Sequence, residues 1–226
     1  MEAAVAVPAA AEPAGLSLAE YGDEVAGCTR CALAKGRTQV VFGSGSPNAE
    51  LMFVGEAPGF HEDKQGVPFV GAAGQLLNKL LAGIGMLREE VFVVNVLKCR
   101  PPGNRDPQQE EIEACEPHLW KQIELIEPKV IATLGNFATK LLSGKPLGIT
   151  RVHGVEQEVV LGGNRVVLYP IFHPAAALYT PRMLEVLEAD FRRLPELLGK
   201  SLAPPVALAP EPEQAPEPAA VQLGLF

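Results

Sequence analysis

The stretch LMFVGEAPGFHEDKQGVPFVG, residues 51–71, begins as a short apolar run and continues as a loop. The run LMFV predicts a buried strand. The loop, residues 55–71, carries four acidic or histidine side chains, four glycines and two aromatic residues. A strand that opens into a loop of this composition predicts a ligand site at the carboxyl end of that strand.

Further apolar, β-rich runs and helical patterns alternate along the rest of the chain. Besides the strand at 50–57, we expect strands at residues 91–99, 129–135 and 165–173. The helical patterns cover residues 71–85, 107–127, 135–143 and 181–199. Continuous apolar runs, unlike alternating ones, are typical of strands buried on both faces. The sequence therefore predicts an α/β fold with a mostly parallel central sheet covered on both faces.

Polar residues interrupt three of these strand ends: GEAPG at 55–59, Asn95 in VFVVNVLK, and His173 in FHPAAALY. Each has an ordinary structural explanation, since a Gly-rich segment is often only a turn and a strand Asn can satisfy backbone groups. The carboxyl ends of parallel strands, however, meet at one edge of a sheet. Their joint occurrence predicts one shared pocket.

The distribution of charge leaves nucleic acid open as a partner. A formal net charge of −8 would by itself argue against it. Residues 1–27 and 201–226, however, contain acidic residues and no Lys or Arg. The part between them is neutral overall, and a neutral body can carry a local basic face that binds DNA or RNA.

The composition predicts one domain with two tails. We expect a disordered segment over residues 1–15, a domain over 16–200, and a Pro- and Ala-rich disordered tail over 201–226. No apolar run is long enough for a spanning helix, so no membrane partner is expected. The acidic N-terminus is unlike a secretory signal, which favours a cytoplasmic protein whose cysteines are reduced or metal-bound.

The chain has four cysteines, Cys28, Cys31, Cys99 and Cys115. Any one alone is readily explained as a small buried hydrophobic residue, and the helical pattern points Cys115 inward. All four together suggest a metal site, because Cys28 and Cys31 have chelating C-x2-C spacing. Four thiolates suit either zinc or an iron–sulfur cluster, and spacing alone does not separate the two.

Several motifs carry a resemblance to a known family. The segments GEAPGFHEDKQGVPFVGAAGQLL, NVLKCRPPGNRDP and HPAAALY, with the four cysteines in this order, resemble the family 4 uracil-DNA glycosylases. The resemblance covers about residues 28–198. It implies a three-layer α/β/α sandwich, a [4Fe-4S] cluster on the four cysteines, and a monomeric enzyme that acts on uracil-containing DNA.

The resemblance also implies roles for the pocket residues. Phe69 is similar to the aromatic residue that stacks on the uracil ring. Asn95 resembles the amide that reads the base edge, donating to O4 and accepting from N3–H, a pattern that cytosine does not offer. His173 would donate to uracil O2 and stabilise negative charge as the base leaves. Gly55, Glu56 and Ala57 are similar to the residues that line the uracil.

One departure from the family 1 enzymes affects the catalytic assignment. Their loop reads Gly-Gln-Asp-Pro-Tyr, with the Asp positioning water and the Tyr blocking the thymine methyl group. Ala57 and Gly59 stand at those places here and can perform neither role. Glu56 is therefore the candidate for polarising water or stabilising the sugar cation. Glu62 is the candidate for closing the pocket against a C5 methyl group.

The remaining site predictions concern DNA. The segment HPAAALYTPR should supply a wedge, with Leu178 or Tyr179 filling the hole left by the extruded base. Lys98, Arg100 and Arg105 cluster beside the pocket and are predicted to contact phosphates. No Lys occupies a position that suggests Schiff-base lyase chemistry. We therefore expect a monofunctional enzyme that leaves an abasic site. The basic, His-containing insertion of a related crosslinking branch is absent after the Asn95 strand.

The last five residues, QLGLF, resemble the pentapeptide by which bacterial repair proteins dock on the replication sliding clamp. Gln222, Leu223, Leu225 and Phe226 would fill a small apolar pocket, with the tail acting as a tether. Two other functions fit parts of the sequence. One is a non-catalytic iron–sulfur module that binds DNA or uracil, and the other is a four-cysteine zinc protein acting on a different nucleobase.

Overall fold

The computed structural model describes residues 16–200 and contains one six-stranded sheet with the order β1-β3-β2-β4-β6-β5. The strands are β1 (Ser44–Gly45), β2 (Leu51–Gly55), β3 (Phe92–Asn95), β4 (Val130–Leu134), β5 (Gln157–Leu161) and β6 (Asn164–Ile171). The four central strands are parallel, and the edge strands β1 and β5 pair antiparallel with β3 and β6. The predicted parallel sheet is confirmed, with two antiparallel edges added.

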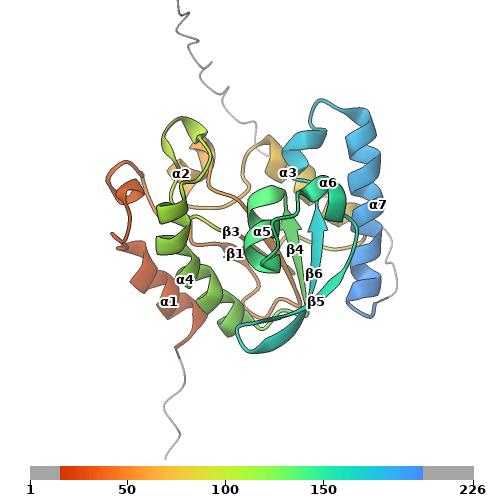
Figure 1. Ribbon diagram of the computed structural model, residues 1–226, viewed down its shortest axis with the longest axis horizontal. Coiled ribbons are helices and arrows are strands. Elements are labelled where there is room, and N and C mark those ends of the chain that lie inside the picture. The colour runs from red at the N-terminus through yellow and green to blue at the C-terminus, as the bar shows by residue number, and fades with distance from the viewer. Residues whose placement is uncertain (1–15, 201–226) are drawn as a thin grey trace, which may run out of the picture.

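The helices within the described residues are α1 (Leu18–Ala26), α2 (Phe60–Gln65), α3 (Ala72–Gly83), α4 (Gln109–Ile126), α5 (Asn136–Ser143), α6 (Ile149–Val152) and α7 (Pro181–Leu197). Short 3₁₀ turns lie at Ala32–Lys35, Pro102–Asn104 and Pro174–Ala177. Figure 1 shows α1 and α4 on one side of the molecule and α7 on the other. The four long helical patterns are thus confirmed, with ends displaced by a few residues.

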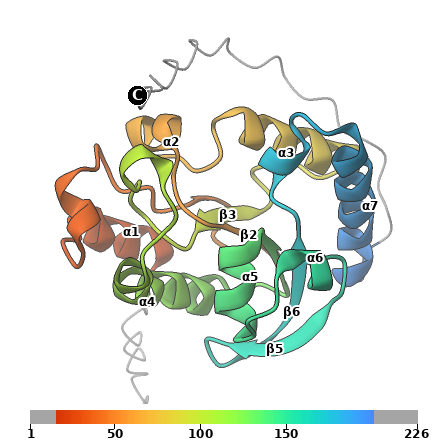
Figure 2. The same cartoon turned by 45° about the horizontal axis from the view of Figure 1, so that its top comes forward.

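Helices cover both faces of the sheet, so the fold is the predicted three-layer α/β/α sandwich. Leu51 and Phe53 of β2 face the layer of α3 and α7. Met52 and Val54, on the opposite face of the same strand, pack with residues of α4 and α5. The strand alternates its side chains between two buried layers, which explains its uninterrupted apolar sequence. The turned view shows α3 and α7 on one side of the strands and α4 and α5 on the other (Figure 2).

Local signals explain most of the element boundaries. Ser17 caps α1, accepting from the backbone N–H of Glu20, whose carboxylate accepts from the N–H of Ser17. Helix α4 begins after Gln108, whose N–H donates to the Glu111 carboxylate. It continues through Pro117, although proline removes one helical hydrogen bond. Burial of the apolar face of α4 on the sheet offsets that loss.

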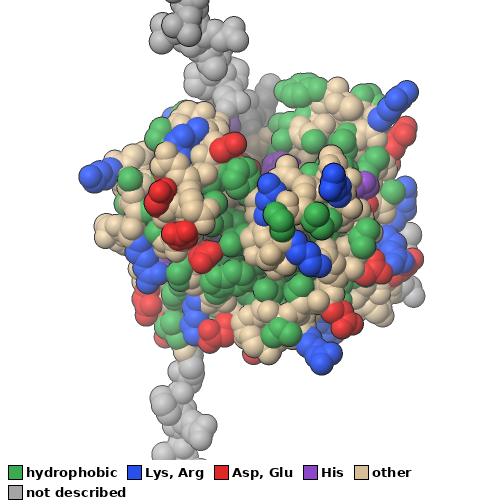
Figure 3. All heavy atoms as spheres, viewed as in Figure 1, with side chains coloured by type: hydrophobic (Ala, Val, Ile, Leu, Met, Phe, Trp, Pro, Cys, Tyr) green, Lys and Arg blue, Asp and Glu red, His purple; other side chains and the backbone are tan. Residues whose placement is uncertain are grey.

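The terminal segments and membrane association were also the subject of predictions. The predicted disordered segment 1–15 and the tail 201–226 lie outside the described residues, as does the QLGLF motif. Within residues 16–200, no helix is both long enough and apolar enough to cross a membrane. Acidic and basic side chains are interspersed over the face seen in Figure 3.

Candidate functional site

The carboxyl ends of the parallel strands open into a cavity of about 660 Å³. Cavities of this size are typical of small-molecule sites. Its walls combine the loop after β2, the end of β3, the 3₁₀ turn after β6 and the loop before α4. The predicted residues that line it are Glu56, Ala57, Glu62, Phe69, Asn95, Arg105, His173, Leu178 and Tyr179.

Gly55 makes the close approach of two pocket side chains possible. A Cβ atom at this position would lie 2.4 Å from Asn95 Oδ1 and 2.8 Å from Phe69 Cζ. Gly55 and Asn95 are also paired residues of the parallel strands β2 and β3. The amide of Asn95 and the ring of Phe69 therefore meet over a glycine that has no room for a side chain.

The backbone holds Phe69 in an unusual conformation. Its φ of 57° lies in the left-handed region, which bulky residues rarely adopt. Glu62 Oε1 accepts from the backbone N–H of Val70 at 3.1 Å and of Gly71 at 3.0 Å, which fixes the turn into α3. A Cβ atom on Gly74 would lie 1.6 Å from the Phe69 carbonyl oxygen. Neighbouring residues thus hold Phe69 in a strained backbone conformation, and this conformation fixes the position of its ring.

His173 is a neutral imidazole with a defined tautomer. Its Nδ1 accepts from the backbone N–H of Ala175 at 3.1 Å, so the ring proton belongs on Nε2. Burial lowers the pKa of His173 to about 4, which keeps the ring neutral near pH 7. The ring stacks with Phe69 at a centroid distance of 5.5 Å and an interplanar angle of 28°. This arrangement provides a neutral N–H donor beside an aromatic platform.

Glu56 is a carboxylate that lines the same cavity. Burial raises its pKa, and the charge of Asp106 raises it further. A carboxylate with a raised pKa in a cavity is a candidate acid, base or electrostatic group. Glu62, by contrast, is committed to the two backbone N–H groups of the α3 turn.

The three predicted phosphate-binding residues differ in exposure. Arg105 pairs with Glu111 at 2.6 Å, and its side chain is part-exposed at the cavity wall. Arg100 donates to Asn104 Oδ1 at 2.6 Å and lies over the ring of Phe60. Lys98 is only 1% exposed, and its Nζ donates to the Asn95 carbonyl oxygen at 2.7 Å. The prediction that Lys98 contacts a phosphate is wrong, because its ammonium points into the protein.

The predicted wedge residues lie at the mouth of the cavity, after the 3₁₀ turn Pro174–Ala177. Tyr179 is 92% exposed, whereas Leu178 is half-buried. An aromatic ring this exposed makes almost no contribution to the core. It is free to contact a partner that covers the cavity mouth.

The four cysteines line a second, small cavity about the loop that ends β3. Cys28 and Cys31 come from the segment between α1 and the first 3₁₀ turn, Cys99 follows β3, and Cys115 lies on α4. Burial raises the pKa of Cys99 to about 11 and also raises that of Cys115. These groups would be neutral thiols without a bound cation, since a coordinated metal is what keeps a buried thiolate ionised.

Three of the cysteine sulfurs have a nitrogen neighbour. Lys98 donates its backbone N–H to Cys115 Sγ at 3.3 Å, and Arg37 donates to Cys99 Sγ at 3.6 Å. His118 Nε2 lies 3.3 Å from Cys28 Sγ. Such donors suit thiolate or cluster sulfurs. Sequence reasoning missed Arg37 and His118, although His118 follows Cys115 by three positions on α4 and that spacing was a usable signal.

The residues described contain no group of three or more His, Cys, Asp or Glu side chains arranged to hold a single metal ion. The cysteines nevertheless share one cavity, with N–H donors directed at their sulfurs. Their donor set therefore fits a thiolate-bound group.

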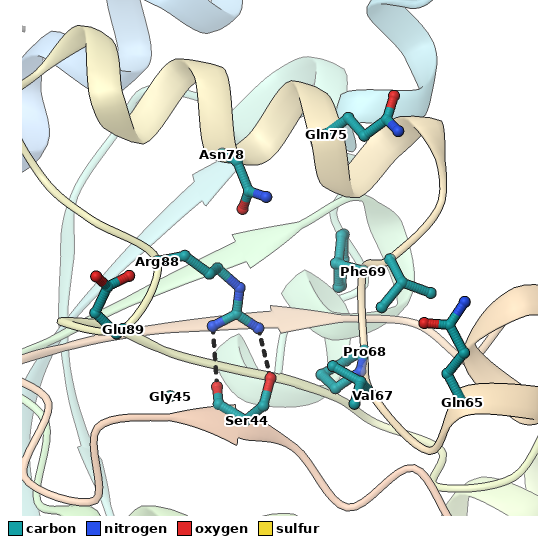
Figure 4. A pocket seen from close by; sticks show the side chains of 11 residues that line it. Ser44, Gly45, Gln65, Val67, Pro68, Phe69, Gln75, Asn78, Arg88 and Glu89 are labelled. Atoms are coloured by element: carbon teal, nitrogen blue, oxygen red, sulfur yellow. Dashed lines mark hydrogen bonds between the residues drawn. The ribbon is translucent and has the colours of Figure 1, made fainter. Parts of the chain in front are cut away.

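A third cavity, of about 480 Å³, lies on the far side of the 65–70 segment, between α3 and β1. Figure 4 shows the Arg88 guanidinium reaching Ser44, to which it donates at 3.0 Å (backbone O) and 2.8 Å (Oγ). Asn78 points toward Arg88 from α3. Burial lowers the pKa of Arg88 to about 10. Arg88 thus holds the short edge strand β1 by two hydrogen bonds to Ser44. Phe69 forms part of the wall of both this cavity and the cavity at the strand ends.

Residues 42–194 match the family model described as the uracil DNA glycosylase superfamily. A type-4 uracil-DNA glycosylase of Sulfurisphaera tokodaii is 48% identical over 186 residues, which cover 80% of this chain and 84% of that protein. One from Archaeoglobus fulgidus is 48% identical over 188 residues, covering 81% and 94%. One from Thermotoga maritima is 48% identical over 157 residues, covering 69% and 80%.

The chain therefore belongs to the uracil DNA glycosylase superfamily. Within the superfamily, the high identity over most of both chains places it in the type-4 family, which confirms the resemblance drawn from the motifs.

Proposed function

We propose that this protein removes uracil from DNA by hydrolysing the N-glycosidic bond, releasing the base and leaving an abasic site. The observation that carries the proposal is that Asn95 and Phe69 meet over Gly55, with His173 stacked on Phe69 in the same cavity. These groups supply an amide, an aromatic face and a neutral N–H donor, which together match a flat base with O4, N3–H and O2 along its edge.

Base selection follows from the amide of Asn95. Its N–H₂ group donates to uracil O4, and its carbonyl oxygen accepts from N3–H. Cytosine presents a donor at the exocyclic position and no proton on N3, so a fixed amide rejects it. The side chain is 2% exposed and packed over Gly55, which restricts its rotation. The adjacent Phe69 ring would stack on the base, at a contribution of about 1–3 kcal/mol.

His173 and Glu56 would stabilise the two charges that develop as the bond breaks. The Nε2–H of His173 is available to donate to uracil O2, where negative charge accumulates. The Glu56 carboxylate faces the cavity and would stabilise the sugar cation or polarise the attacking water. Glu56 must be ionised for this role, so its raised pKa places a lower pH limit on activity.

We further propose that Cys28, Cys31, Cys99 and Cys115 hold a [4Fe-4S] cluster. Their shared cavity and the N–H donors to their sulfurs support this assignment. When bound, the cluster would supply positive charge that keeps the buried cysteines as thiolates. It would also tie the segment 28–31, the end of β3 and α4 together, which makes its role structural.

The damaged nucleotide would be flipped from the duplex into the cavity. Tyr179 and Leu178, at the cavity mouth, would fill the space that the base leaves. Arg100 and Arg105 remain the proposed phosphate contacts. In the tail, Gln222, Leu223, Leu225 and Phe226 are proposed to dock on a sliding clamp, which would raise the local concentration of the enzyme on DNA.

The test is incubation of anaerobically purified protein with a labelled oligonucleotide that contains one uracil, followed by alkali. Strand scission that requires alkali, and that is absent with thymine or cytosine, is expected for a monofunctional enzyme. Asn95→Ala should abolish it. Absence of scission by a cluster-replete, folded sample would contradict the proposal.

A further inference from the structure

Lys98 lies between the cysteine cavity and the base cavity. It precedes Cys99 in the chain, lines the cysteine cavity and is 1% exposed. Its backbone N–H donates to Cys115 Sγ at 3.3 Å, whereas its Nζ donates to the carbonyl oxygen of Asn95 at 2.7 Å. One residue therefore contacts a proposed cluster ligand and the residue proposed to read the base.

Both contacts of Lys98 are buried, and a buried polar group that loses its hydrogen-bond partner costs about 1–3 kcal/mol. The backbone contact joins Lys98 to Cys115, which lies on α4, and the side-chain contact joins it to the end of β3. A cluster bound at Cys115 would fix the position of the Cys115 sulfur. The position of that sulfur thus bears directly on the position of the Lys98 backbone.

The contact with Asn95 reaches the floor of the base cavity. Asn95 is the last residue of β3, and the chain beyond it stays paired with the loop after β2. Val96 N–H donates to the Gly55 oxygen at 2.9 Å, and Leu97 N–H donates to the Glu56 oxygen at 3.0 Å. The peptide carbonyl that Lys98 holds is therefore part of the same short segment that sets the positions of the Asn95 amide and the Glu56 backbone.

We propose that Lys98 is a positioning residue that couples the cysteine-bound group to base recognition by Asn95. The inference rests on the proposed function and on the proposed cluster, and it adds a dependence of one on the other. The Cys115 sulfur holds the Lys98 backbone in place, and the Lys98 Nζ orients the Asn95 carbonyl. Loss of either partner should loosen the amide and weaken the preference for uracil.

The test is a thermodynamic cycle with two chains, wild type and Lys98→Met, each in cluster-replete and chelator-stripped form. The probe is a duplex oligonucleotide with one 2′-fluoro-2′-deoxyuridine, whose glycosidic bond resists hydrolysis. The Kd values of this duplex and of the same duplex with thymine are measured by fluorescence anisotropy. The preference for uracil is the Kd of the thymine duplex divided by the Kd of the uracil probe. Iron content and circular dichroism of every sample establish cluster loading and folding.

Stripping the wild type should reduce the preference for the uracil probe about tenfold, within the usual range of coupling between sites. Cluster-replete Lys98→Met should show a similar reduction, and stripping it should add less than twofold. Lys79→Met removes an exposed Lys of α3 and should behave as the wild type. Equal effects of stripping in both chains, or none in a folded wild type, would overturn the coupling.

Two further measurements apply if a sample does not fold. If stripping unfolds the wild type, the comparison of cluster-replete Lys98→Met with cluster-replete Lys79→Met tests the proposal. Only Lys98→Met should lose the preference for the uracil probe. If Lys98→Met does not fold, the side-chain amide resonance of Asn95 in the wild type should shift on stripping, and an unmoved resonance overturns the proposal. A cluster-replete wild type with no preference for uracil would instead contradict the proposed function itself.

Discussion

Only three residues of chain separate Asn95 of the base cavity from Cys99 of the cysteine cavity, yet the two cavities are built differently. The base cavity is wide, and its groups come from strand ends that the sheet already brings together. The cysteine cavity is small, and its cysteines come from the segment 28–31, the end of β3 and α4. The sheet assembles the first, whereas the proposed cluster would hold the parts of the second together.

The two cavities also differ in how their polar groups are satisfied. In the base cavity, Glu56 and the Nε2 atom of His173 are available for a ligand. In the cysteine cavity, N–H groups are already directed at the sulfurs. This difference indicates that chemistry belongs to the first cavity and support to the second. Each prediction below tests whether that division holds.

The largest effect is expected for Gly55→Ala, which adds a Cβ atom where the Asn95 amide and the Phe69 ring meet. A displacement of about 1 Å can reduce catalysis by about 10²-fold, so uracil excision should fall at least that much. Gly83→Ala is the matched control, because a Cβ atom there meets nothing within 4 Å. Excision rates and melting temperatures of the two variants check the prediction, and an active Gly55→Ala enzyme would contradict the proposed base site.

Glu56→Gln should lower the rate by about 10²-fold, the range for a positioned acid or base. Glu56 acts as a carboxylate, so the wild-type rate should rise with pH through its raised pKa and be lost as pH falls below it. His173 stays neutral above pH of about 4 and does not oppose this rise. A pH–rate profile checks the assignment, since Glu56→Gln should flatten it.

Two controls sharpen the pH test. Asp106→Asn removes a charge that raises the pKa of Glu56, so the midpoint of the profile should move to lower pH. Glu188→Gln removes an exposed carboxylate of α7 and should leave the profile unchanged. A Glu56→Gln enzyme with the wild-type pH profile would assign the titration to another group.

Cys115→Ser tests the supporting cavity. The variant should lose most of its iron and melt several degrees lower, since about 1 kcal/mol corresponds to about 2–4 °C for a chain of this size. Excision by the folded fraction at low temperature should fall about tenfold, the coupling expected through Lys98. Chelator-stripped wild type should match the variant in melting temperature. Full activity with no iron would show that the two cavities are independent.

The smallest effect is expected for Tyr179→Ala, which lies at the mouth of the base cavity and outside the core. Its side chain is 92% exposed, so the melting temperature should not change. Excision from duplex DNA should fall a few-fold, and excision from single strands, which need no wedge, should fall less. The ratio of the two rates is the measurement, and an unchanged ratio would remove Tyr179 from the wedge.

The sequence predicted the parts of the fold whose local signal matches their burial. The uninterrupted apolar runs of β2, β3, β4 and β6 were recognisable because both faces of these strands are covered. Strand β5 was missed because its residues are alternately exposed and half-buried at the sheet edge, and β1 is only two residues long. Edge pairing of this kind depends on the neighbouring strand rather than on composition.

The site was predictable to the same extent. Gly55 and Asn95 end strands and His173 comes two residues after one, so the topology brings them together at one edge. The burial of Lys98 was not predictable, because a Lys between a strand and an Arg-rich loop usually lies at the surface. The inward direction of its side chain depends on the carbonyl of Asn95, which accepts from Nζ, and residue identity alone does not reveal that pairing.

The contact between Gly74 and the Phe69 carbonyl has a consequence for how the chain can vary. Each added residue turns an α-helix by about 100°, so an insertion between Phe69 and Gly74 would bring a side chain against that carbonyl. The segment is therefore a part of fixed length, intolerant of insertions and deletions. Loops that differ in length among relatives should lie elsewhere, and a graft of the aromatic platform into another scaffold would have to carry the first turn of α3 with it.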